Sequence, residues 1–299
     1  MIFLHHVFIV NPKAGKGRAL LMVEKIHARF KESSETYEIK ITEAPGHGEA
    51  LARQMALENK KLRLYSVGGD GTLNEIVNGL AGTDTELGII PCGSGNDTVR
   101  SLYTVTDPVQ LIDLLPSSPS TTVDMGKVND KYFLNIASIG FDAEVVLKSR
   151  LFRRSPLISG SMAYILGVLA TLIRLKKYKL RIAYKELPVK EKDVLLAIFA
   201  NGSYYGGGMK SAPGAKMDDG LLDFYEVEAL PRLKIFRFFP LFQKGKHETM
   251  KEVTILRGTQ VIIESDQPFP MNMDGEIHME SRVSVEILPG FFKIIVPQT

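Results

Sequence analysis

The sequence of 299 residues has one cysteine, little net charge and no long uninterrupted apolar run. The lone Cys92 excludes an internal disulfide framework and suits a reducing cytoplasm. A formal net charge of +3 is too small to indicate nucleic-acid binding, so any basic patch has to be local. We therefore expect neither a disulfide-stapled secreted domain nor a nucleic-acid partner.

The most apolar stretch runs from Leu157 to Ile173 and contains two glycines, two serines and a threonine. A bilayer-spanning helix needs about 20 predominantly apolar residues, so this stretch predicts a buried helix. The N-terminal MIFLHHVFIVNP has no basic region and no cleavage-site pattern, and it predicts a core strand instead of a signal peptide. We expect a cytoplasmic protein whose contact with membranes is peripheral.

Two domains are predicted from a change of pattern along the chain. In the first 120 or so residues, strand-like segments such as LRLYSV and LGIIP alternate with helical patterns, which indicates an α/β domain with a doubly wound, mostly parallel sheet. The later segments, from KLRIAY to VSVEIL and FFKIIV, predict short antiparallel strands of a β-sandwich with helical insertions. We assign residues 1–123, completed by 290–299, to the first domain and 124–289 to the second.

Three glycine-rich segments follow strands of the first domain: NPKAGKG (Asn11–Gly17), GGDGT (Gly68–Thr72) and PCGSGND (Pro91–Asp97). Each alone could be an ordinary tight turn, and none matches the Walker A or G-x-G-x-x-G pattern. Because the carboxyl ends of parallel strands share one edge, the three loops are expected to line one pocket. Bare backbone followed by a helix start suits an anion, most simply a phosphate.

Asp70, inside GGDGT, has two interpretations. It could cap the following helix, because an aspartate at a helix start accepts hydrogen bonds from free N–H groups. It could also hold a metal-bound water near phosphates, since Mg²⁺ prefers carboxylate and phosphate oxygens. The two roles are compatible.

GGDGTLNE followed by PCGSGND resembles the diacylglycerol-kinase catalytic domain. Over its length the chain is most similar to the soluble bacterial diacylglycerol and lipid kinases, relatives of the sphingosine and ceramide kinases. VDMGKVNDKYFLNIASIGFDAEV resembles the family's domain-joining hairpin, KMDDGLLDF its magnesium motif and NMDGE its late catalytic turn. Ser94 stands where the family usually has threonine, which keeps the hydroxyl.

The resemblance implies particular roles for residues. Glu276 would be the general base, and Asp70 would act with it as a catalytic residue. A structural Mg²⁺ would be held by Asp219 and backbone oxygens of Lys216 and Leu221, with Asp124 joining through water. The nucleotide would be lined by Asn11, Pro12, Lys13, Ala14, Gly15, Thr42, Gly68, Gly69, Asp70, Gly71, Thr72, Leu73 and Ser94.

The expected function is ATP-dependent transfer of a γ-phosphate to a lipid hydroxyl, with diacylglycerol as the leading acceptor and Mg²⁺ as the metal. Such a transfer needs positioning, charge neutralisation and a carboxylate that takes the hydroxyl proton. Taken alone, Asp218-Asp219-Gly220 also suits a plain turn, and Asp274-Gly275 a hairpin turn.

Two other functions remain open from the sequence. An NAD kinase shares GGDGT, but it would carry an N-x-G-x-L-G-F-like stretch where PCGSGND stands. A non-catalytic nucleotide-binding regulator on the same scaffold would be expected to lack Asp70 or the late DGE turn, and both are present.

Basic residues flank the apolar stretch in two segments, Lys148–Arg154 and Arg174–Arg181. They form either a solvated face or a surface that docks onto anionic lipid headgroups, with roughly 1 kcal/mol per basic residue held there. The segment VTILRG is a candidate edge strand, through which a homodimer could pair. The basic residues are Lys148, Arg150, Arg153, Arg154, Arg174, Lys176, Lys177, Lys179 and Arg181.

Overall fold

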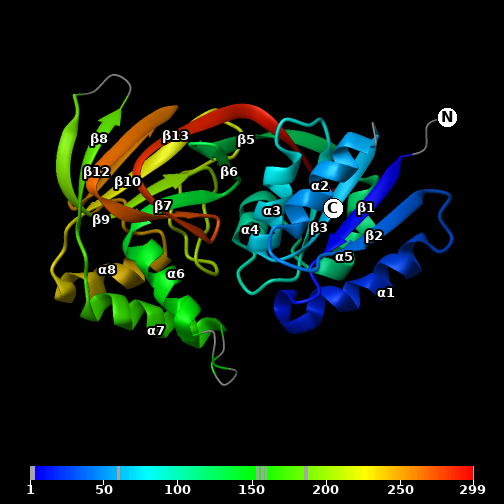
Figure 1. Ribbon diagram of the computed structural model, residues 1–299, viewed down its shortest axis with the longest axis horizontal. Helices are drawn as coiled ribbons and strands as arrows, with labels where there is room; N and C mark the ends of the chain where they lie inside the picture. The colour runs from blue at the N-terminus through cyan, green and yellow to red at the C-terminus, as the bar shows by residue number, and fades with distance from the viewer. Residues whose placement is uncertain are drawn as a thin grey trace.

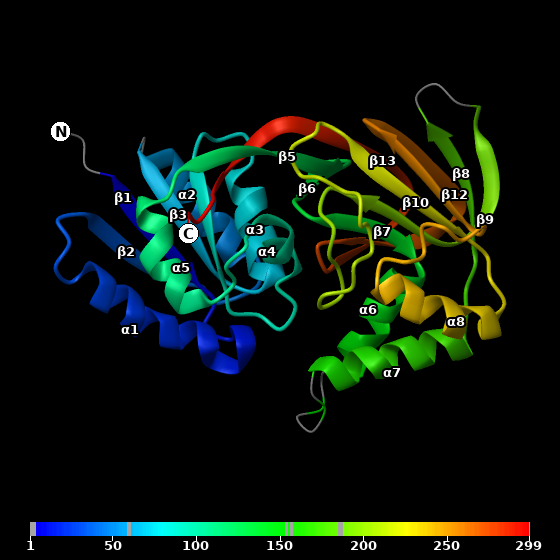
Figure 2. The ribbon, with the colours of Figure 1, turned by 180° about the vertical axis from the view of Figure 1, so that it is seen from behind.

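The computed structural model of the chain describes residues 4–58, 61–152, 155, 158, 160–184 and 188–298. Two domains lie side by side, one with helices around its strands and the other rich in strands (Figure 1). Strands β5 (Ser120–Val128) and β13 (Glu276–Ile295) run from one domain to the other, as the view from behind also shows (Figure 2). The predicted two-domain organisation with a strand-rich C-terminal domain is confirmed.

The N-terminal domain is built on parallel strand pairs. β1 pairs with β2 and β3, β3 pairs with β4, and the end of β13 adds to β4 in the same direction. β1 and β3 are buried along almost their whole length, as expected for strands covered on both faces. These strands are β1 (His5–Val10), β2 (Thr36–Ile41), β3 (Leu62–Gly68) and β4 (Glu86–Pro91).

Helices of this domain pack on the sheet through one apolar face. In α3, residues Leu73, Ile76, Val77 and Leu80 are buried, and their spacing is that of a single helical face. The helical elements are η1 (Ala14–Gly17), α1 (Arg18–Phe30), α2 (His47–Glu58), α3 (Asp70–Leu80), α4 (Asp97–Leu102), α5 (Pro108–Leu114) and η2 (Leu115–Ser117).

Antiparallel pairs dominate the C-terminal domain. β7, β9, β8 and β12 pair in turn, and β12 pairs back with β7, so the four strands form a closed set around an apolar core. β11 lies at one end of the strand order, the edge position predicted for VTILRG. The strands are β6 (Lys131–Phe133), β7 (Ile136–Gly140), β8 (Tyr178–Tyr184), β9 (Lys190–Ala200), β10 (Leu222–Glu228), β11 (Val253–Gly258) and β12 (Gln260–Met273).

Three helices cover one side of this domain: α6 (Phe141–Phe152), α7 (Gly160–Ile173) and α8 (Arg232–Gln243) (Figure 1). The helix predicted from Leu157 begins at Gly160, and Leu157 itself lies outside the described residues. Among the helices that the structure describes, none has both the length and the apolar character to cross a membrane.

One prediction about the strands was wrong, and one helix was missed. VSVEIL and FFKIIV were predicted as separate strands, but both belong to β13. The pairing of β13 with β5 shifts register between Leu288 and Phe292, so Pro289 and Gly290 form a bulge in the strand and do not end it. The short helix α4 was not predicted, because six residues are too few for a periodic apolar pattern.

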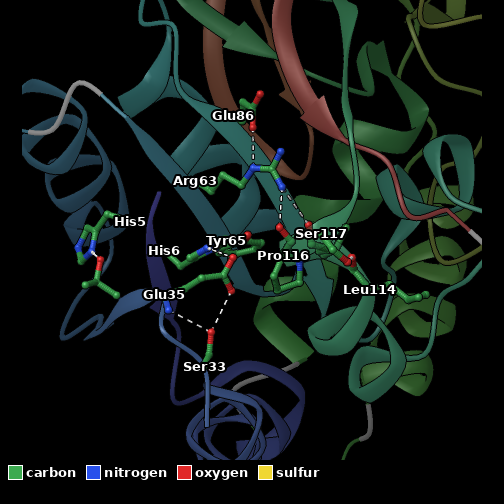
Figure 3. Close-up of polar contacts among 12 residues, drawn as sticks. His5, His6, Ser33, Glu35, Arg63, Tyr65, Glu86, Leu114, Pro116 and Ser117 are labelled. Atoms are coloured by element: carbon green, nitrogen blue, oxygen red, sulfur yellow. Dashed lines mark hydrogen bonds and ion pairs between the residues drawn. The ribbon is translucent and has the colours of Figure 1, made fainter. Parts of the chain in front are cut away.

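A buried polar group lies within the N-terminal domain, among the contacts shown in Figure 3. His6 is 0% exposed; its Nδ1 is 2.8 Å from the Tyr65 hydroxyl, and its Nε2 is 3.7 Å from the Glu35 carboxylate. Burial lowers the pKa of His6 from 6.5 to about 4, although Glu35 opposes the shift. His6 is therefore neutral in the folded protein at pH 7.

His6 should make the stability of the fold depend on pH. Between pH 6.5 and 4 the unfolded chain binds a proton at this site and the folded chain does not, so stability falls as the pH falls. From pH 7 to 4.5 this contribution is about 2 kcal/mol. Denaturant unfolding at the two pH values should show a correspondingly smaller loss in His6→Asn, whereas the exposed-site control His27→Asn should match the wild type. Equal losses in His6→Asn and the wild type would contradict the assignment.

Candidate active site

A cavity of 760 Å³ lies between the two domains and is lined by residues of both. The three glycine-rich loops meet there, opposite the turn that precedes β13. Among the residues predicted for the site, those that line this cavity are Asn11, Ala14, Gly15, Gly69, Asp70, Gly71, Thr72, Ser94 and Glu276.

Direct contacts join the three loops. The Nδ2 group of Asn11 donates to the Thr72 hydroxyl at 2.9 Å, which ties the first loop to the second. A Cβ on Gly15 would lie 2.0 Å from the carbonyl oxygen of Cys92, and a Cβ on Gly69 would lie 3.1 Å from the Cα of Gly93. These close approaches explain why the loops carry glycine and bring bare backbone to one wall of the cavity.

Other predicted residues do not line this cavity: Pro12, Lys13, Thr42, Gly68 and Leu73. Leu73 is buried in the core, and Thr42 is buried just after β2, where its N–H donates to the Val10 carbonyl at 2.9 Å. Their nucleotide-lining role stays a prediction.

Asp70 does not cap its own helix α3, contrary to one of its two predicted roles. Its carboxylate instead accepts hydrogen bonds from the N–H groups of Asn96 at 2.8 Å and Asp97 at 3.0 Å, at the start of α4. Burial raises the pKa of Asp70, and these hydrogen bonds oppose the shift. Asp70 thus joins the second glycine-rich loop to the third.

Asp97 continues this chain of contacts into the C-terminal domain. It accepts from the N–H groups of Gly207 at 2.7 Å and Gly208 at 2.6 Å, and burial raises its pKa to about 6. Gly206, Gly207 and Gly208 all have left-handed φ, at 64°, 88° and 105°, which a residue with a side chain rarely adopts. No role was predicted for this loop or for Asp97, although Asp97 ends the third glycine-rich segment and the run of three glycines is visible in the sequence.

The turn before Glu276 is held in place by hydrogen bonds to Asp274. Asp274 and Gly275 have positive φ and connect β12 to β13, which confirms the hairpin-turn interpretation. The Asp274 carboxylate accepts from the N–H groups of Leu134 at 2.7 Å and Ile136 at 2.9 Å, and burial raises its pKa to about 6. Glu276 is consequently held at the rim of the cavity on a rigid hairpin.

Asp124, on β5, joins the turn predicted to bind a metal to the bulge in β13. This buried carboxylate accepts from the N–H groups of Gly220 at 2.7 Å and Gly290 at 2.8 Å. Asp219 accepts from the Leu221 N–H at 3.1 Å and pairs with Arg257. The Asp124 carboxylate therefore accepts a hydrogen bond directly from the backbone of the predicted metal turn.

Oxygen chemistry at this turn fits Mg²⁺. No group of three or more His, Cys, Asp or Glu suited to a metal occurs in the part of the chain that the structure describes, so backbone oxygens would have to complete a site. Next to the turn, Oδ2 of Asp223 is buried and has no hydrogen-bond partner, although Arg257 pairs with Oδ1. Carboxylate and carbonyl oxygens are the ligands that Mg²⁺ prefers.

The single cysteine, Cys92, directly follows β4. It is buried, and burial raises the pKa of its thiol to about 11. A thiol with a raised pKa is a poor nucleophile at neutral pH.

Two family models match the chain: a diacylglycerol kinase catalytic domain over residues 5–128, and a YegS C-terminal NAD kinase beta sandwich-like domain over residues 135–296. YtlR of Bacillus subtilis, named provisionally as a lipid kinase, is 35% identical over 91% of this chain and 93% of YtlR. A diacylglycerol kinase of Mycobacterium tuberculosis is 30% identical over 97% of this chain and 94% of that enzyme.

The similarity extends to a solved structure. The crystal structure of a provisionally named diacylglycerol kinase from Bacillus anthracis superposes with a TM-score of 0.78 at 26% identity, over 99% of this chain and 98% of that one. With both domains matched in order and relatives aligned over nearly the full length, the chain belongs to the family of diacylglycerol kinases and related lipid kinases.

Proposed function

We propose that this protein is an ATP-dependent kinase that phosphorylates the hydroxyl of a membrane lipid, with diacylglycerol as acceptor and phosphatidic acid as product. The observation that carries the proposal is the cavity in which the glycine-rich loops of one domain face Glu276 of the other. Membership of the lipid kinase family supports the reaction class.

The proposed reaction assigns separate tasks to the two walls of the cavity. Backbone N–H groups of the loops bind the phosphates of ATP, and Glu276 takes the proton of the lipid hydroxyl. The hydroxyl oxygen then bonds to the γ-phosphorus while the bond from that phosphorus to the β–γ bridging oxygen breaks, which leaves ADP. A structural Mg²⁺ would be held by Asp219 with backbone oxygens of Lys216 and Leu221, at a turn outside the cavity lining, where it would offset the charge of the carboxylate.

Labelled ATP with a panel of acceptors tests the proposal. The panel contains diacylglycerol, ceramide, phosphatidylglycerol, undecaprenol and NAD, and we expect labelled phosphatidic acid as the main product. Label in another lipid would keep the lipid kinase and change its acceptor. Label in NAD alone would favour the NAD kinase alternative, and ATP binding with no labelled product would favour a non-catalytic regulator.

We propose further that the protein is cytoplasmic and docks on membranes through α7 and α8. The helix α7 was predicted to be buried, but one of its faces is exposed. The exposed residues, at the spacing of one helical face, are Met162, Ile165, Leu169 and Ile173. On α8, Leu233 is 85% exposed and Phe236 is 57% exposed. We call these six residues the apolar ridge.

The apolar ridge is continuous with the proposed lipid site. Arg232 of α8 donates to the carbonyl oxygen of Ile173 at the end of α7, so the two helices adjoin. Ile165 both belongs to the ridge and lines the cavity, which offers a lipid a short path from the bilayer. An exposed apolar surface next to a cavity is typical of a binding face.

Ion pairs reduce the contribution to membrane docking that is expected from the basic segments. Lys148, Arg150, Lys176, Lys179 and Arg181 each pair with a carboxylate. Arg174 and Lys177 are exposed beside the ridge. Arg153 and Arg154 lie outside the described residues. We therefore propose that apolar contact contributes more to docking than the basic charge does.

Charge placed on the apolar ridge should weaken membrane binding. Phe236→Asp is expected to reduce binding to phosphatidylcholine–phosphatidylglycerol vesicles about 10- to 100-fold, because it removes roughly 1.5–3 kcal/mol of apolar burial. Co-sedimentation measures this, and turnover of a short-chain, monomeric diacylglycerol should not change. Leu57→Asp, at an exposed leucine of α2, is the control. If the two variants bind vesicles equally well, the apolar ridge is not part of the docking surface.

A further inference from the structure

Arg150, on α6, contacts the turn that carries Glu276. Its Nη2 group donates to Oε2 of Glu276 at 3.0 Å and to the carbonyl oxygen of Gly275 at 2.9 Å. The side chains of Arg150 and Glu276 are 45% and 48% exposed, so their ion pair adds little to folding stability. Its place beside the cavity suggests a different task.

The helix that carries Arg150 is anchored on both sides. Glu144, six residues earlier on the same helix, accepts from the Tyr178 hydroxyl at 2.6 Å and from Lys176 at 2.8 Å. On its other side, Gly167 of α7 packs closely on Ser149, with 3.1 Å between the Ser149 Cβ and a Cβ built on the glycine. The Arg150 guanidinium is therefore held by an anchored helix and not by a mobile loop.

The two carboxylate oxygens of Glu276 have different surroundings. Arg150 binds Oε2, whereas Oε1 lies 3.8 Å from a Cβ built on Gly71 in the second glycine-rich loop. One oxygen is thus held by a cation and the other faces the loop proposed to bind phosphate. A charge-assisted hydrogen bond of this kind can fix the rotamer of a carboxylate.

We propose that Arg150 is a positioning residue, which holds Oε2 of Glu276 so that Oε1 stays directed at the lipid hydroxyl. The inference rests on the proposed function, because it takes Glu276 as the general base. It also assigns Arg150 a task inside the cavity instead of the membrane contact expected from its basic segment.

Steady-state kinetics of Arg150→Ala on a short-chain, monomeric diacylglycerol tests the inference without a bilayer. We expect kcat to fall about 10- to 100-fold, because a misplaced base loses near-attack geometry. The KM for ATP should stay within about twofold, since ground-state binding is not affected. Guanidinium ion at sub-denaturing concentration should restore part of kcat in Arg150→Ala, and Arg150→Lys should keep more activity than Arg150→Ala. Arg282→Ala removes another exposed Arg–Glu ion pair of β13 and serves as the control.

A double-mutant cycle separates this inference from the proposed function. In a Glu276→Gln background, Arg150→Ala should cause no further loss of kcat, because it acts through Glu276. Three results would overturn the inference. The first is a double variant whose loss of kcat is the product of the two single losses. The others are a raised KM for ATP with unchanged kcat, and a loss of activity seen only on vesicles. If Arg150→Ala alone keeps normal turnover, the inference fails and the proposed base stands. If Glu276→Gln keeps normal turnover, both fail.

Discussion

Glu276→Gln is expected to lower kcat about 10²- to 10⁴-fold, the usual contribution of a positioned general base. The variant keeps the size of the side chain and removes the carboxylate that would take the hydroxyl proton. ATP binding, measured by calorimetry, should be nearly unchanged, because the phosphates are proposed to bind backbone N–H groups of the glycine-rich loops and not the Glu276 carboxylate. Glu280→Gln, four residues along β13, is the matched control and should behave as the wild type.

Three other carboxylates line the same cavity, and their hydrogen bonds explain why Glu276 is preferred as the base. Asp70, Asp97 and Asp274 each accept hydrogen bonds from at least two backbone N–H groups. Oxygens engaged in this way would have to give up backbone hydrogen bonds to accept the proton of a lipid hydroxyl, so these three carboxylates serve to hold loops in place. Near-normal turnover in Glu276→Gln would show that one of these three, or water, accepts the proton.

The order of strands and helices in the N-terminal domain could be read from local patterns. Buried strands such as β3 are rich in apolar residues, and α3 shows its buried face at positions 73, 76, 77 and 80. Strand ends in the C-terminal domain were harder, because Pro289 and Gly290 signal a break in sequence but are absorbed by a bulge between β13 and β5. Such a bulge depends on the partner strand, which the local sequence does not reveal.

Contacts across the cavity could not be predicted from the sequence. Glycine spacing indicated that three loops share an edge, but it could not show that Asp70 caps the start of α4, a separate element from its own helix. The partner of Asp97, at Gly207 and Gly208, lies 110 and 111 positions away in the chain. Likewise, the pairing of Arg150 with Glu276 spans 126 positions, and a basic segment alone gives no sign of it.

Asp70→Asn is expected to reduce both stability and turnover. In the wild type, Oδ2 accepts from the Asn96 N–H and Oδ1 from the Asp97 N–H. An amide offers one acceptor, so its NH₂ group would face one of these N–H donors in a buried site. Hydrogen bonds to charged groups contribute about 1.5–3 kcal/mol, so denaturant unfolding should show a loss of roughly 2 kcal/mol.

The loss of turnover in Asp70→Asn should exceed what reduced stability explains. Displacing α4 would move Ser94 and Asp97, and with Asp97 the contact to Gly207 and Gly208 that joins the two walls of the cavity. A shift of this kind can cost about 100-fold in kcat, measured at a temperature where the variant is fully folded. Asp107→Asn is the control, because Asp107 caps α5 by accepting from the Gln110 N–H and asparagine also caps well. If folded Asp70→Asn turns over normally, Asp70 is a structural cap with no part in the reaction.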